Sequence, residues 1–439
     1  MTSFLEELRW RGQLHQTAGE GLEEHLRSPS QGGVMRVAYA GFDPTSDSLT
    51  IGNFIPAKAL MHWQQCGHKP IVLMGGGTGL IGDPSGRESE RTLMSREQVE
   101  ANVASQRRIL EKFLDFDRKR PNGAIIVNNA DWLTTLGFLD VLRDVGKHFS
   151  VNEMIQRDSV RKRLEQRDHG ISYTEFSYML LQAYDFLHLF RTLGCTVQVG
   201  GADQYGNIVS GMDLIRREHA GAPDKGRAFG VTVPLVTRSD GKKMSKSEGT
   251  AIFMSDGTRD RTTPYAFYQF WINLPDADAV QWIMWYTLMP RDEVESLAAQ
   301  QQQNPQDRPA QRALARHMTT LVHGTAETAR IEAASRALFS GEVRELDAAS
   351  LRMICQEIPH VAMPRDQVIG APVVDLLVAS GAAASKREAR EFIQKAAVTV
   401  SGRPVSDPAS TLLPDHVLPG GVALFRRGKK TWAAVMIRD

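Results

Sequence analysis

Short apolar segments alternate with helix-like segments through the first half of the chain. The apolar segments are RVAYAGF (36–42), PIVLMGGG (70–77), AIIVNNA (124–130), TVQVGG (196–201) and VTVPLV (231–236). After the first of them, a helical pattern continues through Gln65 and stops at Gly67. Strands that alternate with helices predict an α/β fold, with a parallel sheet covered on both faces. In such sheets, ligands bind beyond the carboxyl ends of the strands.

The pattern changes twice further along the chain. Residues 249–345 are predicted to be helical, with a helix start at Thr263-Pro264 and breaks near Pro275, Pro290 and QQQNPQDRP. We expect a linker over 346–365. Residues 366–439 then combine a helix that ends at Gly381, a basic helix SKREAREFIQK, and short strands around VTVSGRPV and ALFRRGKKTWAAVMI. The chain is thus predicted to contain an α/β domain (1–248), a helical domain, a linker and a small α+β domain.

Polar and glycine-rich segments follow the first two predicted strands. In GGGTGLIGDPSGRESER, the glycines allow backbone N–H groups to approach a phosphate, and Arg87 and Arg91 follow within reach of a polyphosphate. In GFDPTSDSLTIGN, Thr45 and Thr50 supply hydroxyls, and Gly52 leaves room for a flat group against the backbone. The structural alternatives are a tight turn in the first segment and an ordinary capped helix in the second.

A helix with apolar residues nearly all round carries one polar stripe. In TEFSYMLLQAYDFLHLF (174–190), Tyr178, Gln182 and Asp185 are spaced i, i+4, i+7 and share one side of the helix. A buried polar stripe must be satisfied, either by a polar ligand or by a structural hydrogen-bond network. In GGADQYGN, Asp203 and Gln204 follow another strand, where they can bind a ribose or an ammonium group or cap the next helix.

The segment GKKMSKSEG (241–249) places Lys242, Lys243 and Lys246 among Gly and Ser, directly after the last strand. A flexible loop with mobile ammonium groups suits a charge that develops only in a transition state, because it can close over a polyphosphate late. The alternative is a solvated loop. The position beside the other strand ends favours the phosphate interpretation.

Composition narrows the class of protein. The 439 residues carry a net charge of +1, so any polyanion site must be local. There is no apolar run of membrane length and no signal-peptide pattern at the N-terminus, which predicts a cytoplasmic protein without membrane contact. The three cysteines lack metal-type spacing, so we expect no protein-bound metal or prosthetic group. Residues 366–439 hold ten basic against seven acidic side chains, which indicates a phosphate-binding surface or a solvated face.

Six segments of the chain resemble motifs of the bacterial tyrosyl-tRNA synthetases, a family of class I aminoacyl-tRNA synthetases. In order they are YAGFDPTSDSL, GGGTGLIGDPSGR, VGKHFSVN, TEFSYMLLQAYDF, GGADQYGN and KMSKS (243–247). The resemblance implies a Rossmann-like catalytic domain, an α-helical domain and a small S4-like RNA-binding domain. It also implies a homodimer that uses L-tyrosine, ATP with its accompanying Mg²⁺, and tRNA(Tyr), and forms tyrosyl-adenylate and pyrophosphate before it charges the tRNA.

The resemblance assigns a role to each candidate residue. Tyr39 and Asp185 would hold the tyrosine hydroxyl, and the amino group of tyrosine would lie against Asp83, Tyr178 and Gln182, with Gln204 alongside. The groups on ATP would be Asp43, Gly52, Gly201 and Asp203 for the nucleoside, Thr45 for the γ-phosphate, and Lys243, Lys246, Arg87 and Arg91 for the pyrophosphate, with Asn53 as a further ATP-binding residue. The RNA-binding residues would be Lys386, Arg387, Arg390, Arg426, Arg427, Lys429 and Lys430.

Two departures from the family pattern keep alternatives open. The signature His-Ile-Gly-His reads Thr50-Ile51-Gly52-Asn53, so the first position cannot become cationic; Tyr205 also replaces a common Trp. The Thr50 replacement is compatible with a weaker ligase or with an RNA-binding paralogue that lacks ligase activity. A synthetase for tryptophan is a further alternative, but indole has no hydroxyl for Tyr39 and Asp185 to bind.

Overall fold

A computed structural model of the chain describes residues 3–27, 29, 32–83, 93–157, 160–161, 164, 171–236, 251–255 and 261–438. They form two compact units: unit 1 comprises Met1–Thr262 and Phe270–Val322, and unit 2 comprises Thr263–Gln269 and His323–Asp439. Arg87 and Arg91, and Lys243 and Lys246 of the lysine loop, lie outside the described residues. Within the described ranges, no helix is both long enough and apolar enough to cross a membrane.

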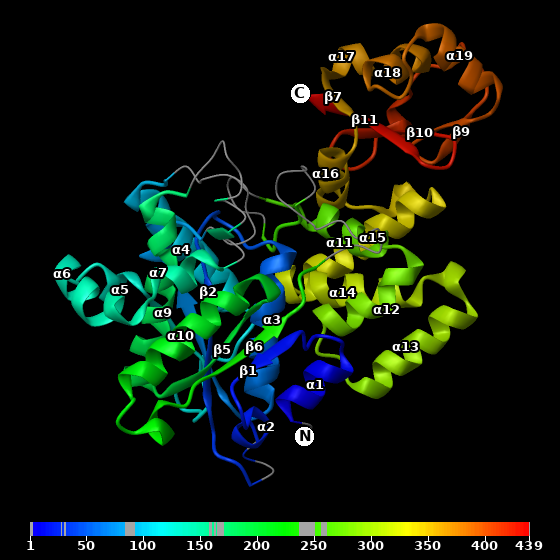
Figure 1. Cartoon of the computed structure of the whole chain (residues 1–439). Coiled ribbons are helices and arrows are strands. Elements are labelled where there is room, and N and C mark those ends of the chain that lie inside the picture. Colours follow the sequence, from blue (N-terminus) through cyan, green and yellow to red (C-terminus); the bar gives the residue numbers. More distant parts are fainter. Residues whose placement is uncertain are drawn as a thin grey trace. The chain divides into compact units, whose positions relative to one another are not determined.

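A six-stranded sheet forms the centre of unit 1 (Figure 1). Its strands are β1 (Gln16–Ala18), β2 (Val37–Phe42), β3 (Lys69–Met74), β4 (Ile125–Asn128), β5 (Cys195–Gly201) and β6 (Phe229–Val233). The order is β1-β6-β5-β2-β3-β4, and all neighbours are parallel except β1 and β6. The chain moves outward from β2 to β4 and then returns to the other side of β2. This doubly wound arrangement confirms the predicted α/β fold and places a ligand crevice at the carboxyl ends of β2 and β5.

Helices surround this sheet. Those of the α/β part are α1 (Phe4–Trp10), α2 (Leu22–His25), α3 (Ile51–Gln65), α4 (Arg96–Leu110), α5 (Ala130–Leu133), α6 (Phe138–Asp140), α7 (Val151–Ile155), α9 (Tyr173–Leu193) and α10 (Tyr205–Glu218). Helix α9 begins where the Ser172 hydroxyl accepts a hydrogen bond from the Glu175 N–H, and it ends at Gly194 with φ 61°. These caps define the ends of α9. Its apolar side chains, such as Phe186 and Leu187, pack in the core, and the predicted polar stripe faces the crevice.

The helices that follow the α/β part are α11 (Pro264–Ile272), α12 (Asp276–Tyr286), α13 (Arg291–Gln303) and α14 (Pro309–His323). Residues 270–322 belong to unit 1, whereas the sequence analysis separated 249–345 as one helical domain. The division differs because the aromatic side chains of α11 and α12 pack on α3. Tyr286 stacks on Phe54 of α3 at 6.1 Å and contacts Trp271 at 4.8 Å. Breaks in helical periodicity mark the ends of helices, but they do not show which helices share a core.

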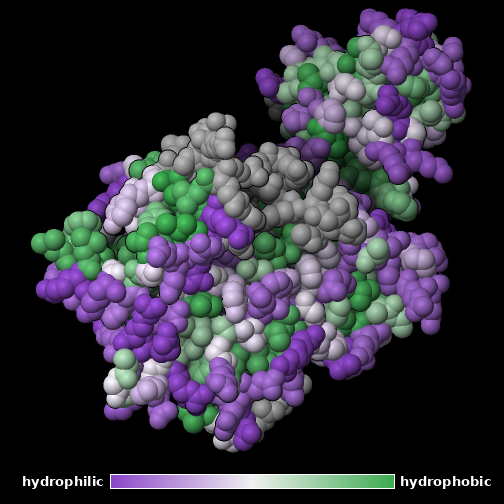
Figure 2. Space-filling model, viewed as in Figure 1, coloured by the Kyte–Doolittle hydropathy of each residue, from purple (hydrophilic) through white to green (hydrophobic). Residues whose placement is uncertain are grey.

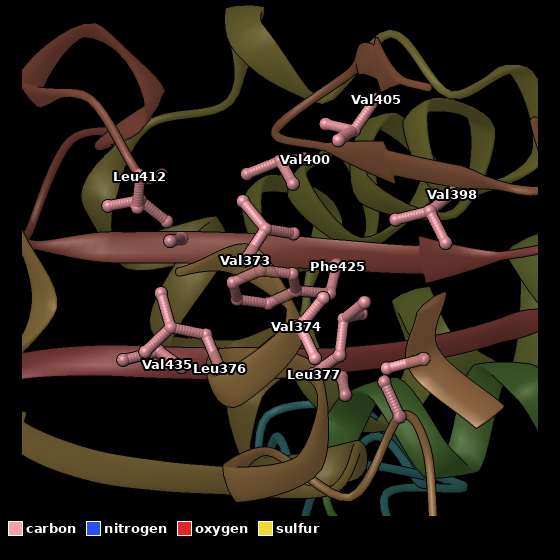
Figure 3. Close-up of a cluster of buried hydrophobic side chains, with 14 of the residues drawn as sticks. Val373, Val374, Leu376, Leu377, Val398, Val400, Val405, Leu412, Phe425 and Val435 are labelled. Atoms are coloured by element: carbon pink, nitrogen blue, oxygen red, sulfur yellow. The ribbon is translucent and has the colours of Figure 1, made fainter. Parts of the chain in front are cut away.

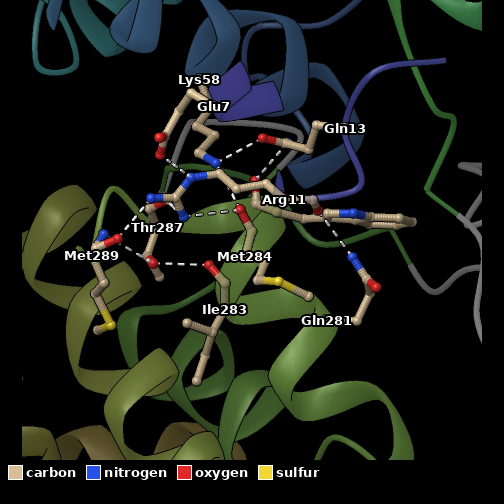
Figure 4. A network of polar contacts seen from close by, with 10 residues as sticks. Glu7, Arg11, Gln13, Lys58, Gln281, Ile283, Met284, Thr287 and Met289 are labelled. Carbon is tan, nitrogen blue, oxygen red and sulfur yellow. Dashed lines mark hydrogen bonds and ion pairs between the residues drawn. The ribbon is translucent and has the colours of Figure 1, made fainter. Parts of the chain in front are cut away.

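A buried polar network fixes the end of α12 to the N-terminal segment and α3 (Figure 4). The Lys58 ammonium donates to the Gln13 side chain and to the Met284 carbonyl, both at 2.7 Å. The Arg11 guanidinium pairs with Glu7 at 2.7 Å and donates to the carbonyls of Thr287 (3.1 Å) and Met289 (2.6 Å). Burial lowers the pKa of Lys58 well below its usual value. The network thereby satisfies carbonyl groups at the C-terminal end of α12, where positive charge is favourable.

Unit 2 contains a five-stranded sheet in the order β7-β11-β10-β8-β9. Its strands are β7 (His360–Pro364), β8 (Val398–Val400), β9 (Arg403–Val405), β10 (Val422–Arg427) and β11 (Thr431–Arg438), and its helices are α15 (Thr325–Ser340), α16 (Ala348–Glu357), α17 (Arg365–Val368), α18 (Val373–Ala379) and α19 (Lys386–Gln394). Phe425 and Val435 of the sheet pack against Leu376 and Leu377 of α18 (Figure 3). This small α+β arrangement agrees with the predicted C-terminal fold class.

The range assigned to a linker, 346–365, has regular structure. It contains α16, which is capped by Asp347, and β7, which pairs in parallel with β11 from Ala434 to Arg438. The sequence VAMP (361–364) gives only a weak strand signal, because Pro364 cannot donate to a ladder. The prediction of a linker is wrong for this range. The sequence did not reveal β7, because it is an edge strand whose partner, β11, lies over 70 residues away in sequence.

Candidate active site

A cavity of about 330 Å³ lies at the carboxyl ends of β2, β5 and β6. Every described residue that was predicted to bind tyrosine or ATP lines it: Tyr39, Asp43, Thr45, Thr50, Gly52, Asn53, Asp83, Tyr178, Gln182, Asp185, Gly201, Asp203 and Gln204. The sequence separates these residues by up to 165 positions, and the doubly wound topology brings them together. Four carboxylates are among them, and no Lys or Arg side chain lines the cavity in the described part of the chain. The cavity therefore favours a cationic group such as an ammonium.

Asp185 occupies a buried position on α9, 1% exposed. Its Oδ1 accepts a hydrogen bond from the indole N–H of Trp132 (2.7 Å), and its Oδ2 accepts one from the Asn129 amide (2.8 Å). Burial raises the pKa of Asp185 to about 7, although these two hydrogen bonds lower it. The carboxylate is thus held in one orientation, with acceptor capacity left for a ligand.

Tyr39 lies beside Asp185 and is equally buried. Burial, followed by the charge of Asp185, raises its pKa well above 10, so the phenol stays neutral and can donate. Its hydroxyl has no hydrogen-bond partner among the described residues, and neither does Oε1 of Gln198, the partner of Tyr39 on β5. Buried polar groups are rarely left unsatisfied in a native protein. These two atoms, both on the cavity wall, point to a polar ligand.

Asp43 joins the ends of β2 and α9. Its Oδ2 accepts a hydrogen bond from the Tyr178 hydroxyl (2.9 Å), and its Oδ1 accepts one from the Thr78 hydroxyl (3.0 Å). Gly75 is required beside it, because a Cβ at that position would lie 2.3 Å from Asp43 Oδ1. The backbone approach at the end of β3 therefore helps to fix the carboxylate in the crevice.

A chain of amides connects Asp83 to α9 and α10. The Gln204 amide donates to Asp83 Oδ2 (2.8 Å), and Gln204 Oε1 accepts from Gln182 (3.2 Å) and from Asn207 (3.2 Å). Asn207 also donates to Gln182 Oε1 at 2.9 Å. Three of the predicted amino-group ligands, Asp83, Gln182 and Gln204, are thus joined by hydrogen bonds, whereas Tyr178 donates to Asp43.

Thr50 and Asn53 cap α3. The Asn53 N–H donates to the Thr50 hydroxyl (3.3 Å), and the Thr50 N–H donates to Asn53 Oδ1 (3.1 Å). The capped-helix alternative from the sequence is therefore realised, and it coexists with a place in the cavity wall. Histidine in place of Thr50 would not form this reciprocal cap.

Sequence reasoning missed four polar residues of the site: Thr78, Asn129, Trp132 and Gln198. A signal for one of them existed, since Asn129 follows the strand AIIVNNA at its carboxyl end. Trp132 gave no signal, because its partner Asp185 is 53 residues away on another helix. In the described ranges, no group of three or more His, Cys, Asp or Glu side chains is arranged to hold a metal ion.

The basic residues predicted to bind RNA lie on α19 and on the β10–β11 hairpin of unit 2. Arg387, Arg390, Lys429 and Lys430 are exposed. Lys386 pairs with Asp375 at 2.8 Å, and Arg427 lies 3.6 Å from Glu388. Arg426 has a structural role in addition, because it hydrogen-bonds backbone carbonyls at two places.

Comparison with known proteins identifies the family. Residues 34–340 match the family model of the class I tRNA synthetases (W and Y), and residues 350–435 match the tyrosine–tRNA ligase SYY-like C-terminal domain. The chain belongs to the tyrosine–tRNA ligase family of class I tRNA synthetases. The tyrosine–tRNA ligase of Bacillus caldotenax is 46% identical over 431 residues, 98% of both chains. That of Roseiflexus castenholzii is 43% identical over 440 residues, the full length of both.

A solved structure agrees with this assignment. The C-terminally truncated mitochondrial tyrosyl-tRNA synthetase of Aspergillus nidulans has a TM-score of 0.67 and 31% identity, and the match covers 77% of this chain and 95% of that one. The family resemblance seen in the sequence motifs is thereby confirmed.

Proposed function

We propose that the chain catalyses the two steps of a tyrosine–tRNA ligase. The tyrosine carboxylate attacks the α-phosphorus of ATP; the new O–P bond forms as the bond to pyrophosphate breaks, which gives tyrosyl-adenylate. The terminal ribose hydroxyl of tRNA(Tyr) then takes the tyrosyl group and AMP leaves. The observation that carries this proposal is the pair of buried groups Tyr39 and Asp185 on the cavity wall.

A phenol fits between these two groups. Its O–H can donate to Asp185, and its oxygen can accept from the Tyr39 hydroxyl, which has no partner among the described residues. Phenylalanine would leave both protein groups unsatisfied in a buried site. Sites of this kind disfavour an analogue that lacks the hydroxyl by about 10⁴- to 10⁵-fold. The same argument disfavours tryptophan.

The other end of the substrate fits the carboxylate and amide groups. The ammonium of tyrosine would lie against Asp83, Tyr178 and Gln182, near Gln204. Asp43, Gly52, Asn53, Gly201 and Asp203 would hold the nucleoside. We assign Thr45 and Thr50 to the phosphate end, where Thr50 acts through its hydroxyl because it cannot supply a cationic ring. Mg²⁺ would accompany the ATP phosphates, since the proposal requires no resident metal.

The positive charge for the leaving pyrophosphate would come from Lys243, Lys246, Arg87 and Arg91. This part of the proposal rests on the sequence motifs and on the cavity wall, which has no described cation of its own. Lys386, Arg387, Arg390, Arg427, Lys429 and Lys430 would contact tRNA phosphates, with Arg426 at the same surface. A ligase of this kind acts where translation occurs, and we therefore place the chain in the cytoplasm.

We also propose a homodimer. Apolar side chains on and beside α6 and α7 are exposed: Phe138 (67%), Leu139 (76%), Leu142 (41%), Val151 (56%) and Ile155 (36%). Figure 2 shows a green surface patch over α6. A cluster of this kind marks an interaction site rather than scattered surface residues. Leu139→Asp should convert the dimer to a monomer in light-scattering measurements, whereas an unchanged mass would exclude this surface as the interface.

The function is tested by ATP–pyrophosphate exchange with tyrosine, phenylalanine, tryptophan or no amino acid. We expect exchange with tyrosine alone and, in Lys246→Ala, a severe loss of rate with unchanged folding. RNA binding by folded protein without exchange would instead support the paralogue alternative, which the similarity to ligases along the whole chain does not favour.

A further inference from the structure

The indole of Trp132 contacts two side chains of α9. Its N–H donates to Asp185 Oδ1 at 2.7 Å, and its face stacks on the imidazole of His188, with ring centroids 4.3 Å apart and an angle of 14° between the planes. Asp185 and His188 are spaced i, i+3, so they lie on the same side of the helix, one turn apart. One helix therefore holds both the edge and a face of the same indole.

Trp132 depends on these contacts for its orientation. It lies on α5, a helix of four residues, which is far too short to be stable by itself. The indole N–H lies in the plane of the rings, so a rotation of that plane moves the N–H away from Asp185. A stacked partner opposes such a rotation, because parallel rings lose contact when one of them turns. His188 thus restrains the hydrogen bond that orients the Asp185 carboxylate.

The stack on Trp132 is the closest ring contact of His188. In the part of the chain that the structure describes, the imidazole forms no hydrogen bond, and the ring of Tyr184 lies 6.3 Å away. Burial, followed by the charge of Arg191, lowers the pKa of His188, so the ring is neutral at pH 7 and brings no charge close to Asp185. The described cavity wall includes Asp185 but neither Trp132 nor His188. The imidazole can therefore affect a ligand only through the residues in front of it.

We propose that His188 is a positioning residue for tyrosine recognition: by stacking on Trp132, it keeps the Asp185 carboxylate aimed at the phenol of the substrate. The proposal rests on the proposed function, in which Asp185 accepts a hydrogen bond from the tyrosine hydroxyl. Hydrogen bonds weaken steeply when their distance or angle departs from the preferred geometry. The effect of His188 should therefore appear in the recognition of the hydroxyl and not in the binding of ATP.

The alternative is an aromatic contact that contributes only to stability, and His219 offers a matched comparison. Its ring packs on Phe190, another aromatic side chain of α9, with centroids 5.4 Å apart. Both histidines are partly buried. The His219 ring hydrogen-bonds the Ile215 carbonyl of α10, and His219 does not belong to the described cavity wall. The two histidines thus differ in whether their aromatic partner donates to Asp185.

The test measures ATP–pyrophosphate exchange by the full-length chain. An aromatic pair corresponds to about a 2- to 13-fold change in an equilibrium constant. His188→Ala should raise the KM for tyrosine by about that factor and leave the KM for ATP unchanged. Because phenylalanine has no hydroxyl for Asp185, its kcat/KM should stay at the parental value, and the preference for tyrosine over phenylalanine should fall by the same factor.

Further variants separate stacking from bulk. His188→Phe keeps a flat ring on Trp132 and should have the parental KM for tyrosine. His188→Leu has similar bulk without a flat ring and should behave like His188→Ala. His219→Ala is the matched control and should also keep the parental KM for tyrosine.

A double variant shows whether His188 acts through Trp132. In Trp132→Phe the hydrogen bond to Asp185 is absent, so the addition of His188→Ala should raise the KM for tyrosine no further. Additive effects of the two substitutions would overturn the proposal, because His188 would then act by another route.

The remaining outcomes distinguish this inference from the proposed function. A parental KM for tyrosine in folded His188→Ala overturns the positioning role and leaves the ligase function intact. Equal losses with tyrosine and phenylalanine would show a general structural effect, which also overturns it. If His188→Ala does not fold, His188→Leu and His188→Phe decide, since equal KM values for tyrosine in these two would exclude stacking. Absence of tyrosine-dependent exchange in the parent refutes the ligase function itself.

Discussion

The ionisation of Asp185 costs the folded chain stability, and the cost depends on pH. Burial raises the pKa of this carboxyl to about 7, while an unfolded aspartate has a pKa of about 3.9. The folded state therefore binds the proton more tightly than the unfolded state does. The stabilising contribution of the protonated form is fully present below about pH 4 and is lost as the pH rises through 7.

Asp185→Asn removes this cost. The difference of about three pKa units corresponds to about 4 kcal/mol above pH 7.5, and about 3 kcal/mol of it develops between pH 5 and pH 8. The amide cannot accept from both Asn129 and Trp132, and the lost hydrogen bond costs about 1–3 kcal/mol at every pH. Relative to the parent, the variant should thus gain about 3 kcal/mol of stability between pH 5 and pH 8, while tyrosine activation should be lost.

The assay is urea unfolding of the ligand-free chain at pH 5, 6, 7 and 8, followed by tryptophan fluorescence. Six of the seven tryptophans belong to unit 1, so the signal reports on the unit that contains the site. Asp213→Asn is the matched control, because Asp213 is only partly buried and pairs with Arg216 in the same unit; this variant should show no such pH-dependent gain. If Asp185→Asn and the parent keep a constant stability difference across this range, then Asp185 is not buried as a high-pKa acid and the reasoning fails.

Three further predictions concern neighbouring parts of unit 1. Arg11→Met should lower the free energy of unfolding by about 3–5 kcal/mol in urea titrations, because it strands buried partners; Arg9→Met, which removes an exposed ion pair, should cost at most about 1 kcal/mol. Trp132→Phe removes a hydrogen bond that lowers the pKa of Asp185. The pH profile of kcat/KM for tyrosine should therefore move to higher pH, with a loss of rate at neutral pH; an unchanged profile would argue against this hydrogen bond. Thr50→Ser should keep the α3 cap and most of the exchange rate, while Thr50→Ala should lose about 1 kcal/mol of stability by thermal unfolding; equal stability of the two variants would argue against the cap.

The sequence alone was sufficient for the strand ends and the α9 stripe, because both signals are local. Alternation of strands and helices places Asp43, Asp203 and their neighbours at one edge of the sheet, and helical spacing places Tyr178 and Asp185 on one side of α9. The orientation of the Asp185 carboxylate could not be predicted from the sequence, because its partner Trp132 lies on a four-residue helix that is too short to show a periodic pattern. The burial of Arg11 and Lys58 could not be predicted either, because they donate to backbone carbonyls at and just after the C-terminal end of α12, which no side-chain pattern records.

Two buried polar clusters of unit 1 differ in how their charged side chains are satisfied. Around Arg11 and Lys58, each cation has hydrogen-bonding partners, as a structural network requires. In the cavity, the Tyr39 hydroxyl and Gln198 Oε1 are buried without partners among the described residues, and Asp185 is ionisable at a cost. Buried atoms without a partner among the described residues also occur outside the cavity, Tyr286 Oη and His62 Nε2 among them, but those on the cavity wall can be satisfied by a ligand. Under the proposed function, a phenol would satisfy two groups at once, as donor to Asp185 and acceptor from Tyr39. The buried groups that cost the fold stability would then be the same ones that select tyrosine.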